Sequence, residues 1–301
     1  KEHGVADVMI NPLREDPEEV IKSLTDGRGA FMLVEEFAAC YKTGVKPACV
    51  EEKLISSKND MPKNSTLPFI SKLLVKRANS QWKKENHTLS YDEYLKLAND
   101  YLATDKLDRK IKIETPEAYK EMTESCYDHH VSVNDYLMAK MYVEDKTDKI
   151  IIAYDLREKL ACYKKGAMGN YSTAFSVVYK NKCDDIWKVA ADVRALVKKT
   201  SANPRDLYLV LQCYADLNGE LLDATFVASK CGYDSKAANF IGTMFFGFGE
   251  SKGYSITNLG KFDSSNIDEA VFMPPASPAT KKTVGVVSVN GRMFMSSAVR
   301  N

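Results

Sequence analysis

Apolar residues recur at helical spacing over much of the first third of the chain. Over 29–41 they return every three or four residues, which predicts a helix with one apolar face. The segment 45–68 is polar and contains prolines, which is typical of a surface connection. Residues 69–110 show helical spacing again, with a capping pattern at Ser90, and we expect the charged run 106–112 at their end to be solvated.

Strand patterns dominate the second half. Residues 149–155 are apolar on both faces, which predicts a strand internal to a sheet, and 170–180 alternate apolar with polar positions. Asn290-Gly291 between two apolar runs is a strong hairpin signal. Helices are expected to begin near Pro116, Val133, Ile186 and Pro204, the last continuing to about Leu217. The order of these elements predicts a mixed α/β protein.

Composition narrows the class of protein. Among 301 residues, 45% are hydrophobic and 28% charged, the balance of a soluble globular chain. The formal net charge of +1 argues against nucleic acid as the main partner. No apolar run is long enough for a membrane helix. Seven scattered cysteines without a close pair indicate reduced thiols rather than a zinc site or disulfides, so we expect a cytoplasmic protein without a metal.

Four short stretches carry the most specific signal. They are Thr25–Phe31 (TDGRGAF), Asp155–Arg157 (DLR) with Gly169–Tyr171 (GNY), Phe246–Gly249 (FGFG) and Ser255–Gly260 (SITNLG). In this order, with a helix after the first and a hairpin at the end, they resemble the CoA-dependent acyltransferase superfamily. That superfamily includes chloramphenicol acetyltransferase, alcohol acetyltransferases, plant hydroxycinnamoyl-type transferases and the condensation domains of peptide synthetases. The resemblance covers roughly residues 20–301 and is closer to the alcohol acetyltransferase branch.

The resemblance implies a two-lobed fold of the chloramphenicol acetyltransferase type. Each lobe has a sheet covered by helices, and the sheet of the second lobe is mixed and largely antiparallel. We assign 1–48 to a remnant of the first lobe with the DG motif and its helix, 49–118 to a connecting helical segment and 119–301 to the second lobe. The first lobe is incomplete in this assignment, which leaves room for a partner chain.

The family motif HHxxxDG supplies the general base, and here the match breaks. Aligning Asp26-Gly27 with the end of the motif places Ile21 and Lys22 on the two histidine positions. A lysine of ordinary pKa, about 10.4, is protonated at pH 7 and is no base. Three explanations stay open: a non-catalytic family member, a fragment or half of a split protein, or a sequence that omits residues around 1–22.

Other residues take roles from the resemblance. The motif's aspartate pairs with an arginine and fixes the loop, which maps onto Asp26 and Arg157, and the amide of Asn258 is placed to hydrogen-bond a substrate or an oxyanion. The site is therefore expected to be shaped by Asp26, Gly27, Arg157 and Asn258, with substrate contacts at Thr257 and Gly249.

A second histidine pair imitates the motif. His129-His130 is followed by Asn134-Asp135, but this segment also matches a helix entrance of the second lobe, so we interpret both histidines as surface residues. The function implied is direct transfer of an acyl group, most simply acetyl, from acyl-CoA to an alcohol or amine, with coenzyme A thioester as substrate and no bound cofactor. The alternatives are a binding or scaffolding protein that kept this fold without the base, and a small helical-β domain unrelated to the family.

Overall fold

The computed structural model describes residues 43–44, 53, 55, 57–164, 167, 170–265 and 267–301. The predicted helix over 29–41 and the candidate residues Lys22, Asp26 and Gly27 lie outside these ranges. Within them the protein is mixed α/β, as predicted.

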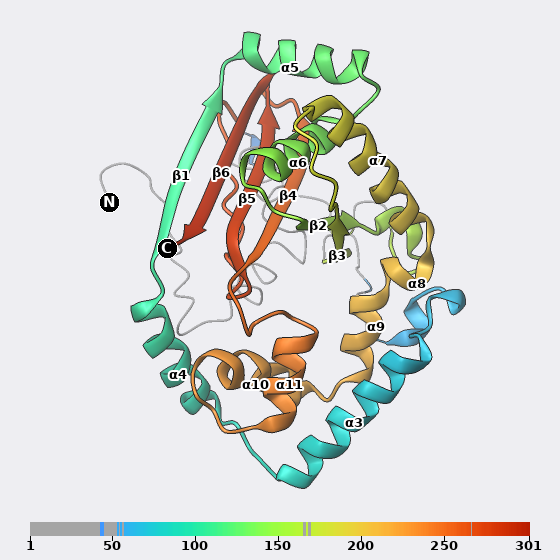
Figure 1. The fold of residues 1–301 in the computed structure, drawn as a ribbon, viewed down its shortest axis with the longest axis vertical. Helices are drawn as coiled ribbons and strands as arrows, with labels where there is room; N and C mark the ends of the chain where they lie inside the picture. The colour runs from blue at the N-terminus through green and yellow to red at the C-terminus, as the bar shows by residue number, and fades with distance from the viewer. Residues whose placement is uncertain are drawn as a thin grey trace.

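The described residues form a six-stranded sheet with the order β1-β6-β5-β4-β2-β3 (Figure 1). The β2–β4 and β4–β5 pairs are parallel, and the other three pairs are antiparallel. The expectation of a mixed, largely antiparallel sheet is therefore confirmed. The strands are β1 (Leu107–Glu114), β2 (Lys149–Asp155), β3 (Ser172–Val178), β4 (Gly253–Phe262), β5 (Thr280–Val289) and β6 (Arg292–Arg300).

Some helices cover one face of the sheet, and a separate group of helices lies beyond one end of the strands (Figure 1). The three short 3-10 helices are η1 (Lys58–Asp60), η2 (Lys63–Ser65) and η3 (Arg157–Lys159). The α-helices are α3 (Phe69–Glu85), α4 (Tyr91–Thr104), α5 (Pro116–Asp128), α6 (Val133–Glu144), α7 (Ile186–Ala202), α8 (Pro204–Leu207), α9 (Leu209–Asp216), α10 (Gly219–Lys230) and α11 (Lys236–Met244).

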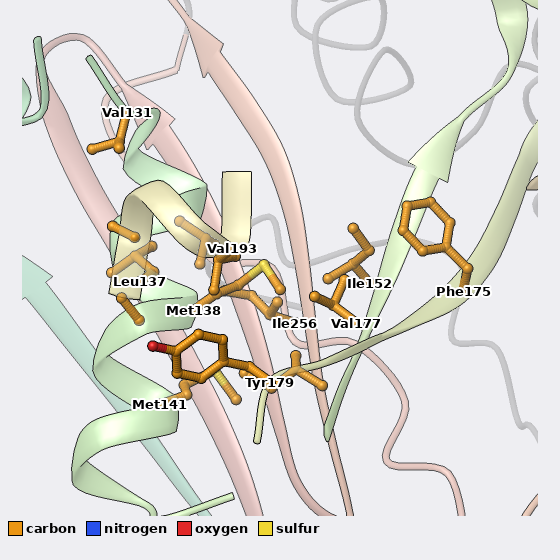
Figure 2. Packing of buried hydrophobic residues seen from close by; sticks show 14 of the residues in the cluster. Val131, Leu137, Met138, Met141, Ile152, Phe175, Val177, Tyr179, Val193 and Ile256 are labelled. Atoms are coloured by element: carbon orange, nitrogen blue, oxygen red, sulfur yellow. The ribbon is translucent and has the colours of Figure 1, made fainter. Parts of the chain in front are cut away.

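The main core lies between the sheet and the helices α6 and α7. Met138 of α6 is fully buried there, with Val193 of α7 and Ile256 of β4 nearby (Figure 2). Sequence determines where α6 starts, because Ser132 and Asp135 form a capping box in which each side chain bonds the other's backbone N–H. A second core joins α3 to α9, α10 and α11.

Two predicted elements differ from the structure. Residues 107–110, expected to end the helical region 69–110, belong to the edge strand β1, which pairs with β6 and is exposed along most of its length, as expected for the charged run. The helix expected over 204–217 is broken at Tyr208, whose buried hydroxyl donates a hydrogen bond to the carbonyl of Lys159. The stretch Phe246–Gly249, one of the four motif stretches, lies in the turn after α11.

The hairpin between β5 and β6 is confirmed. Asn290 and Gly291 have φ of 47° and 77°, as a tight turn between twisted strands requires. The Asn290 side chain also holds the chain before it, because its Nδ2 donates to the carbonyls of Ser264 and Ile267, each at 2.9 Å, and its Oδ1 accepts from the Ser264 N–H at 2.8 Å.

Asn290→Ala is expected to destabilise the protein by about 2 kcal/mol, because it removes these bonds and places a Cβ-bearing residue without a local polar side chain at positive φ. Urea unfolding measures the change in the free energy of unfolding. Asn290→Gly is the control, since glycine restores the backbone freedom without the hydrogen bonds, and it should recover part of the loss. An alanine variant as stable as the parent would contradict the role of the side chain.

Candidate functional site

The carboxyl ends of three parallel strands meet at one edge of the sheet. These strands are β2, β4 and β5, with β4 between the other two. In the strand order, β3 lies beside β2 on one side, and β5 lies beside β4 on the opposite side. The connections that follow β2 and β4 therefore run in opposite directions along the sheet. In open α/β sheets, ligands bind outside the carboxyl ends of strands at such a switch point. This edge is therefore the first place to look for a site.

Arg157 lies at this edge, immediately after β2. Its backbone N–H donates to Asp155 Oδ1 at 2.9 Å and its Nη1 donates to Asp155 Oδ2 at 2.8 Å, and both side chains are exposed. The predicted pairing of DLR with GNY is confirmed, because the Leu156 N–H donates to the Tyr171 carbonyl at 2.8 Å. The expected partner of Arg157, Asp26, lies outside the described residues, so that pairing stays a prediction.

Asn258 lies at the same edge, beyond the last residue of β4 that pairs with β2. Its Oδ1 accepts a hydrogen bond from the Gly260 N–H at 2.8 Å, where the register between β4 and β5 shifts and Gly260 has φ of 86°. The side chain is exposed, and its Nδ2 has no hydrogen-bond partner within the described part of the chain. An amide held by its oxygen presents two N–H donors to a carbonyl or oxyanion.

Thr257 lies on the other face of the sheet from Asn258, since side chains alternate along a strand. Ile256 and its β2 partner Ile152 are buried under α6, so Thr257 shares the opposite face with Ala153 and Asp155. The structure therefore brings Thr257 and Asn258 to one edge but on different faces.

Gly249 lies at the other end of β4, away from Arg157 and Asn258. The turn that contains it lines a hollow of about 560 Å³, together with Lys149 and Ile151 of β2 and Ser176 of β3. Gly247 in this turn has φ of 71°, a conformation that favours glycine. The hollow opens onto the same face of the sheet as Thr257, because Ile151 and Ala153 share a face.

One face of the sheet, which no described helix or strand covers, joins these two places. We call it the open face; its residues are exposed or half-buried, in contrast to the buried residues that alternate with them. It consists of Lys149, Ile151, Ala153 and Asp155 of β2 and Ser172, Ala174, Ser176 and Val178 of β3. At about 3.3 Å per residue the seven-residue strand β2 spans roughly 20 Å. Mostly small side chains leave this face free for an elongated ligand.

Sequence reasoning missed the β2 and β3 members of the open face, apart from the DLR end. A signal was present, because Ala153, Ala174 and Ser176 alternate with the large apolar residues of the same strands. Their small size indicates a face that packs against no helix. Periodicity alone, however, reveals only the buried face of such strands.

Three of the thiols in the described residues are poor nucleophiles because they are buried. Cys126, Cys162, Cys183, Cys213 and Cys231 are all free, as expected for reduced cysteines. Burial raises the pKa of Cys126, Cys213 and Cys231 to about 11, so these thiols are protonated at pH 7. Within the same residues, no group of three or more His, Cys, Asp and Glu side chains could hold a metal ion.

The histidine pair between α5 and α6 is at the surface, as predicted. His129 stacks on Trp187 with 4.0 Å between ring centroids, and its Nδ1 lies 2.8 Å from the Ser125 carbonyl. His130 is exposed and has φ of 57° in the turn that leads to α6. These contacts are those of a helix entrance.

No protein-family model matches the chain, and no curated protein does. Among solved structures, polyketide synthase associated protein 5 from Mycobacterium tuberculosis is similar at 13% identity and a TM-score of 0.44, covering 89% of this chain and 61% of that one. The epimerization domain from the third module of tyrocidine synthetase B is similar at 14% identity and a TM-score of 0.45, covering 89% of this chain and 59% of that one. The condensation enzyme VibH is similar at 8% identity and a TM-score of 0.43, covering 89% of this chain and 57% of that one.

The chain thus spans less than two thirds of the length of each of these three structures. TM-scores below 0.5 at such identities are too low to establish a shared activity. None of the three is named as an alcohol acetyltransferase, so that branch stays a prediction. Among the helices of the described residues, none has the length and apolar character needed to cross a bilayer.

Proposed function

We propose that this chain forms one wall of an acyl-thioester site and takes part in transferring an acyl group from acyl-CoA to an alcohol or amine. The observation that carries the proposal is the open face, which joins the hollow at Gly249 to the edge with Arg157 and Thr257. A pantetheine arm is long, narrow and largely uncharged, which suits a face of small side chains. The resemblance of the DLR, GNY and TNLG stretches to acyltransferase motifs supports the same assignment.

The proposed chemistry is direct attack on the thioester. The acceptor oxygen or nitrogen attacks the thioester carbon, its proton passes to a general base, and the C–S bond breaks to release coenzyme A as the thiol. The hydroxyl of Thr257, which lies on the same face as Ala153 and Asp155, would donate a hydrogen bond to the charge that develops on the carbonyl oxygen. The Asp155–Arg157 pair would hold the chain after β2 in place. In the resembling motif the base is a histidine, and Lys22 stands at that position in this sequence.

The test is release of free thiol from acetyl-CoA in the presence of a series of alcohols and amines. Thr257→Val is expected to lower kcat about 100-fold, because one oxyanion donor is lost. Ala153→Trp is expected to raise KM for the thioester about 10-fold, because the indole would occupy the middle of the open face.

Matched controls are Asn258→Ala, which removes an exposed amide at the same edge but on the other face of the sheet, and Ile111→Trp, which enlarges an exposed strand residue on β1. Both should leave the two constants unchanged. Thiol release by the parent that neither site variant alters would contradict the assignment of the site, and no release with any acceptor would contradict catalysis.

The alternative is a binding or scaffolding protein with the same open face, and Lys22 in place of the histidine favours it. Such a protein would bind acetyl-CoA or coenzyme A without turnover. Calorimetry with the non-hydrolysable thioether of coenzyme A separates the two functions. Binding weakened by Ala153→Trp, together with no thiol release, would identify the scaffold.

A further inference from the structure

The outer face of helix α3 carries side chains that the rest of the described protein does not cover. Val75, Ala78 and Trp82 are buried against residues of α9, α10 and α11. Because an α-helix turns about 100° per residue, these three side chains lie on one side of α3. The opposite side faces outward at the margin of the molecule (Figure 1).

The beginning of this outer face is apolar. Phe69, Ile70 and Leu73 are 80%, 70% and 56% exposed, and all three fall within the first two turns. Single exposed apolar side chains are common on protein surfaces, whereas a contiguous group marks a contact site.

The rest of the outer face is basic. Its five exposed cations are Lys72, Lys76, Arg77, Lys83 and Lys84. No described carboxylate forms an ion pair with any of them, whereas Lys110, Lys112, Lys140 and Lys282 elsewhere are each paired.

Acidic residues that could neutralise the positive charge of this face are lacking in the nearby sequence. The sequence has no Asp or Glu from 61 to 84, although the whole chain has nearly equal numbers of acids and bases. Glu85, the sole acid of α3, accepts hydrogen bonds from Ser235 Oγ at 2.7 Å and the Ala237 N–H at 3.1 Å, so its charge is used at the start of α11. The outer face is therefore a local concentration of unneutralised positive charge.

We propose that the outer face of α3 binds the surface of an anionic lipid bilayer. Phe69, Ile70 and Leu73 would enter the boundary between headgroups and acyl chains, and the flanking cations would contact anionic headgroups. Four of the five cations are lysines, which act as flexible point charges rather than as the fixed forks that a protein hot spot favours.

The test is co-sedimentation of the whole chain with vesicles of phosphatidylcholine alone or with phosphatidylserine added. Binding is expected only with phosphatidylserine and should weaken as salt is raised. Lys72→Glu/Lys76→Glu should lower the partition coefficient at least about 25-fold, because each surface cation contributes a factor of about 5. The matched control is Lys198→Glu/Lys199→Glu on α7, which makes the same change in net charge at exposed positions and should leave binding unchanged.

A second variant tests the apolar contact without a change in charge. Phe69→Ser/Leu73→Ser should also weaken binding, and both positions are exposed enough for the variant to fold. Three results would overturn the proposal: no binding of the parent to phosphatidylserine vesicles, equal losses in the α3 and α7 charge variants, or full binding by the serine variant. Equal affinity for soluble polyglutamate would also overturn it, in favour of an acidic polymer. None of these results bears on thiol release at the open face.

Discussion

Replacing Arg300 with methionine is expected to destabilise the protein by about 3–5 kcal/mol. Arg300 Nε and Nη2 donate to the two carboxylate oxygens of Asp105 at 2.6 and 2.8 Å, and the two side chains are only 10% and 8% exposed. Its Nη1 donates to the carbonyls of Ser277 and Thr280. Removing the arginine takes both charged donors from a buried carboxylate and one donor from each of two carbonyls, which costs far more than the loss of a surface pair.

The position of this pair explains why the effect should be large. Asp105 ends α4 and Arg300 ends β6, and the two carbonyls lie just before and at the start of β5. The guanidinium of Arg300 therefore connects α4, in the group of helices beyond the end of the strands, to the adjacent ends of β5 and β6. Ala279, between the two carbonyls, lines the hollow at Gly249, so we expect loosening here to reach the proposed site.

The pH dependence of the effect follows from the same pair. Hydrogen bonds from Arg300 hold the pKa of Asp105 below its ordinary value. A carboxylate of depressed pKa stabilises the fold above its unfolded pKa of about 3.9, and this contribution is lost as pH falls through the folded pKa. In Arg300→Met the lone carboxylate is protonated more easily. The difference in unfolding free energy between parent and variant should therefore shrink when urea unfolding is repeated near pH 3 instead of pH 7.

Lys252→Met is the control for Arg300, because its pair with Glu250 is exposed and should contribute less than about 1 kcal/mol. The double variant Arg300→Met/Asp105→Leu removes both charges and should recover part of the stability. An Arg300→Met variant no less stable than Lys252→Met would show that the pair does not hold α4 to the ends of β5 and β6.

Much of the sheet could be predicted from sequence because one of its faces is buried. The alternation in β3 follows from packing of one face under α6 and α7. The apolar run of β2 suggests burial on both faces, but only Ile150 and Ile152 are buried, whereas Ala153 is exposed on the open face. Strand β1 could not be predicted in this way, since charges such as Lys110 and Lys112 alternate with Ile111 and Ile113, which are themselves exposed. Its conformation is decided by pairing with β6, far away in the sequence.

The starts of helices α10 and α11 are marked in the sequence by N-cap residues. Asn218 and Ser235 accept hydrogen bonds from the backbone N–H groups of Leu221 and Ala238, as N-cap residues do. Tyr208 shows the opposite case, because no turn-forming residue marks the break between α8 and α9.

The candidate site was predictable in its residues more than in its geometry. Arg157 and Asn258 reach one edge because parallel neighbouring strands end together, which the motifs alone do not reveal. Gly249 is separated from them by the length of β4. The face on which Thr257 lies depends on the register of β4 against β2, and register is a property of the assembled sheet.

Met138→Ala is expected to destabilise the protein by about 3 kcal/mol. Met138 is fully buried at the centre of the main core, where α6 and α7 meet the sheet (Figure 2). Truncation removes apolar contact and leaves a cavity between packed elements that can close only in part. It also removes the sulfur that the Nδ2 of Asn134 contacts at 3.8 Å, and the Oδ1 of that buried amide already has no partner among the described residues. Urea unfolding measures the loss.

Met244→Ala is the matched control, since this methionine ends α11 and is largely exposed, and its change should stay within about 0.5 kcal/mol. Met138→Leu keeps most of the volume and should cost less than about 1.5 kcal/mol. Because α6 supports β2 and β4 from the buried face, the alanine variant should also weaken the ligand binding proposed for the open face, even under conditions where it stays folded. Equal stability of the Met138 and Met244 alanine variants would mean that α6 does not hold these strands in register.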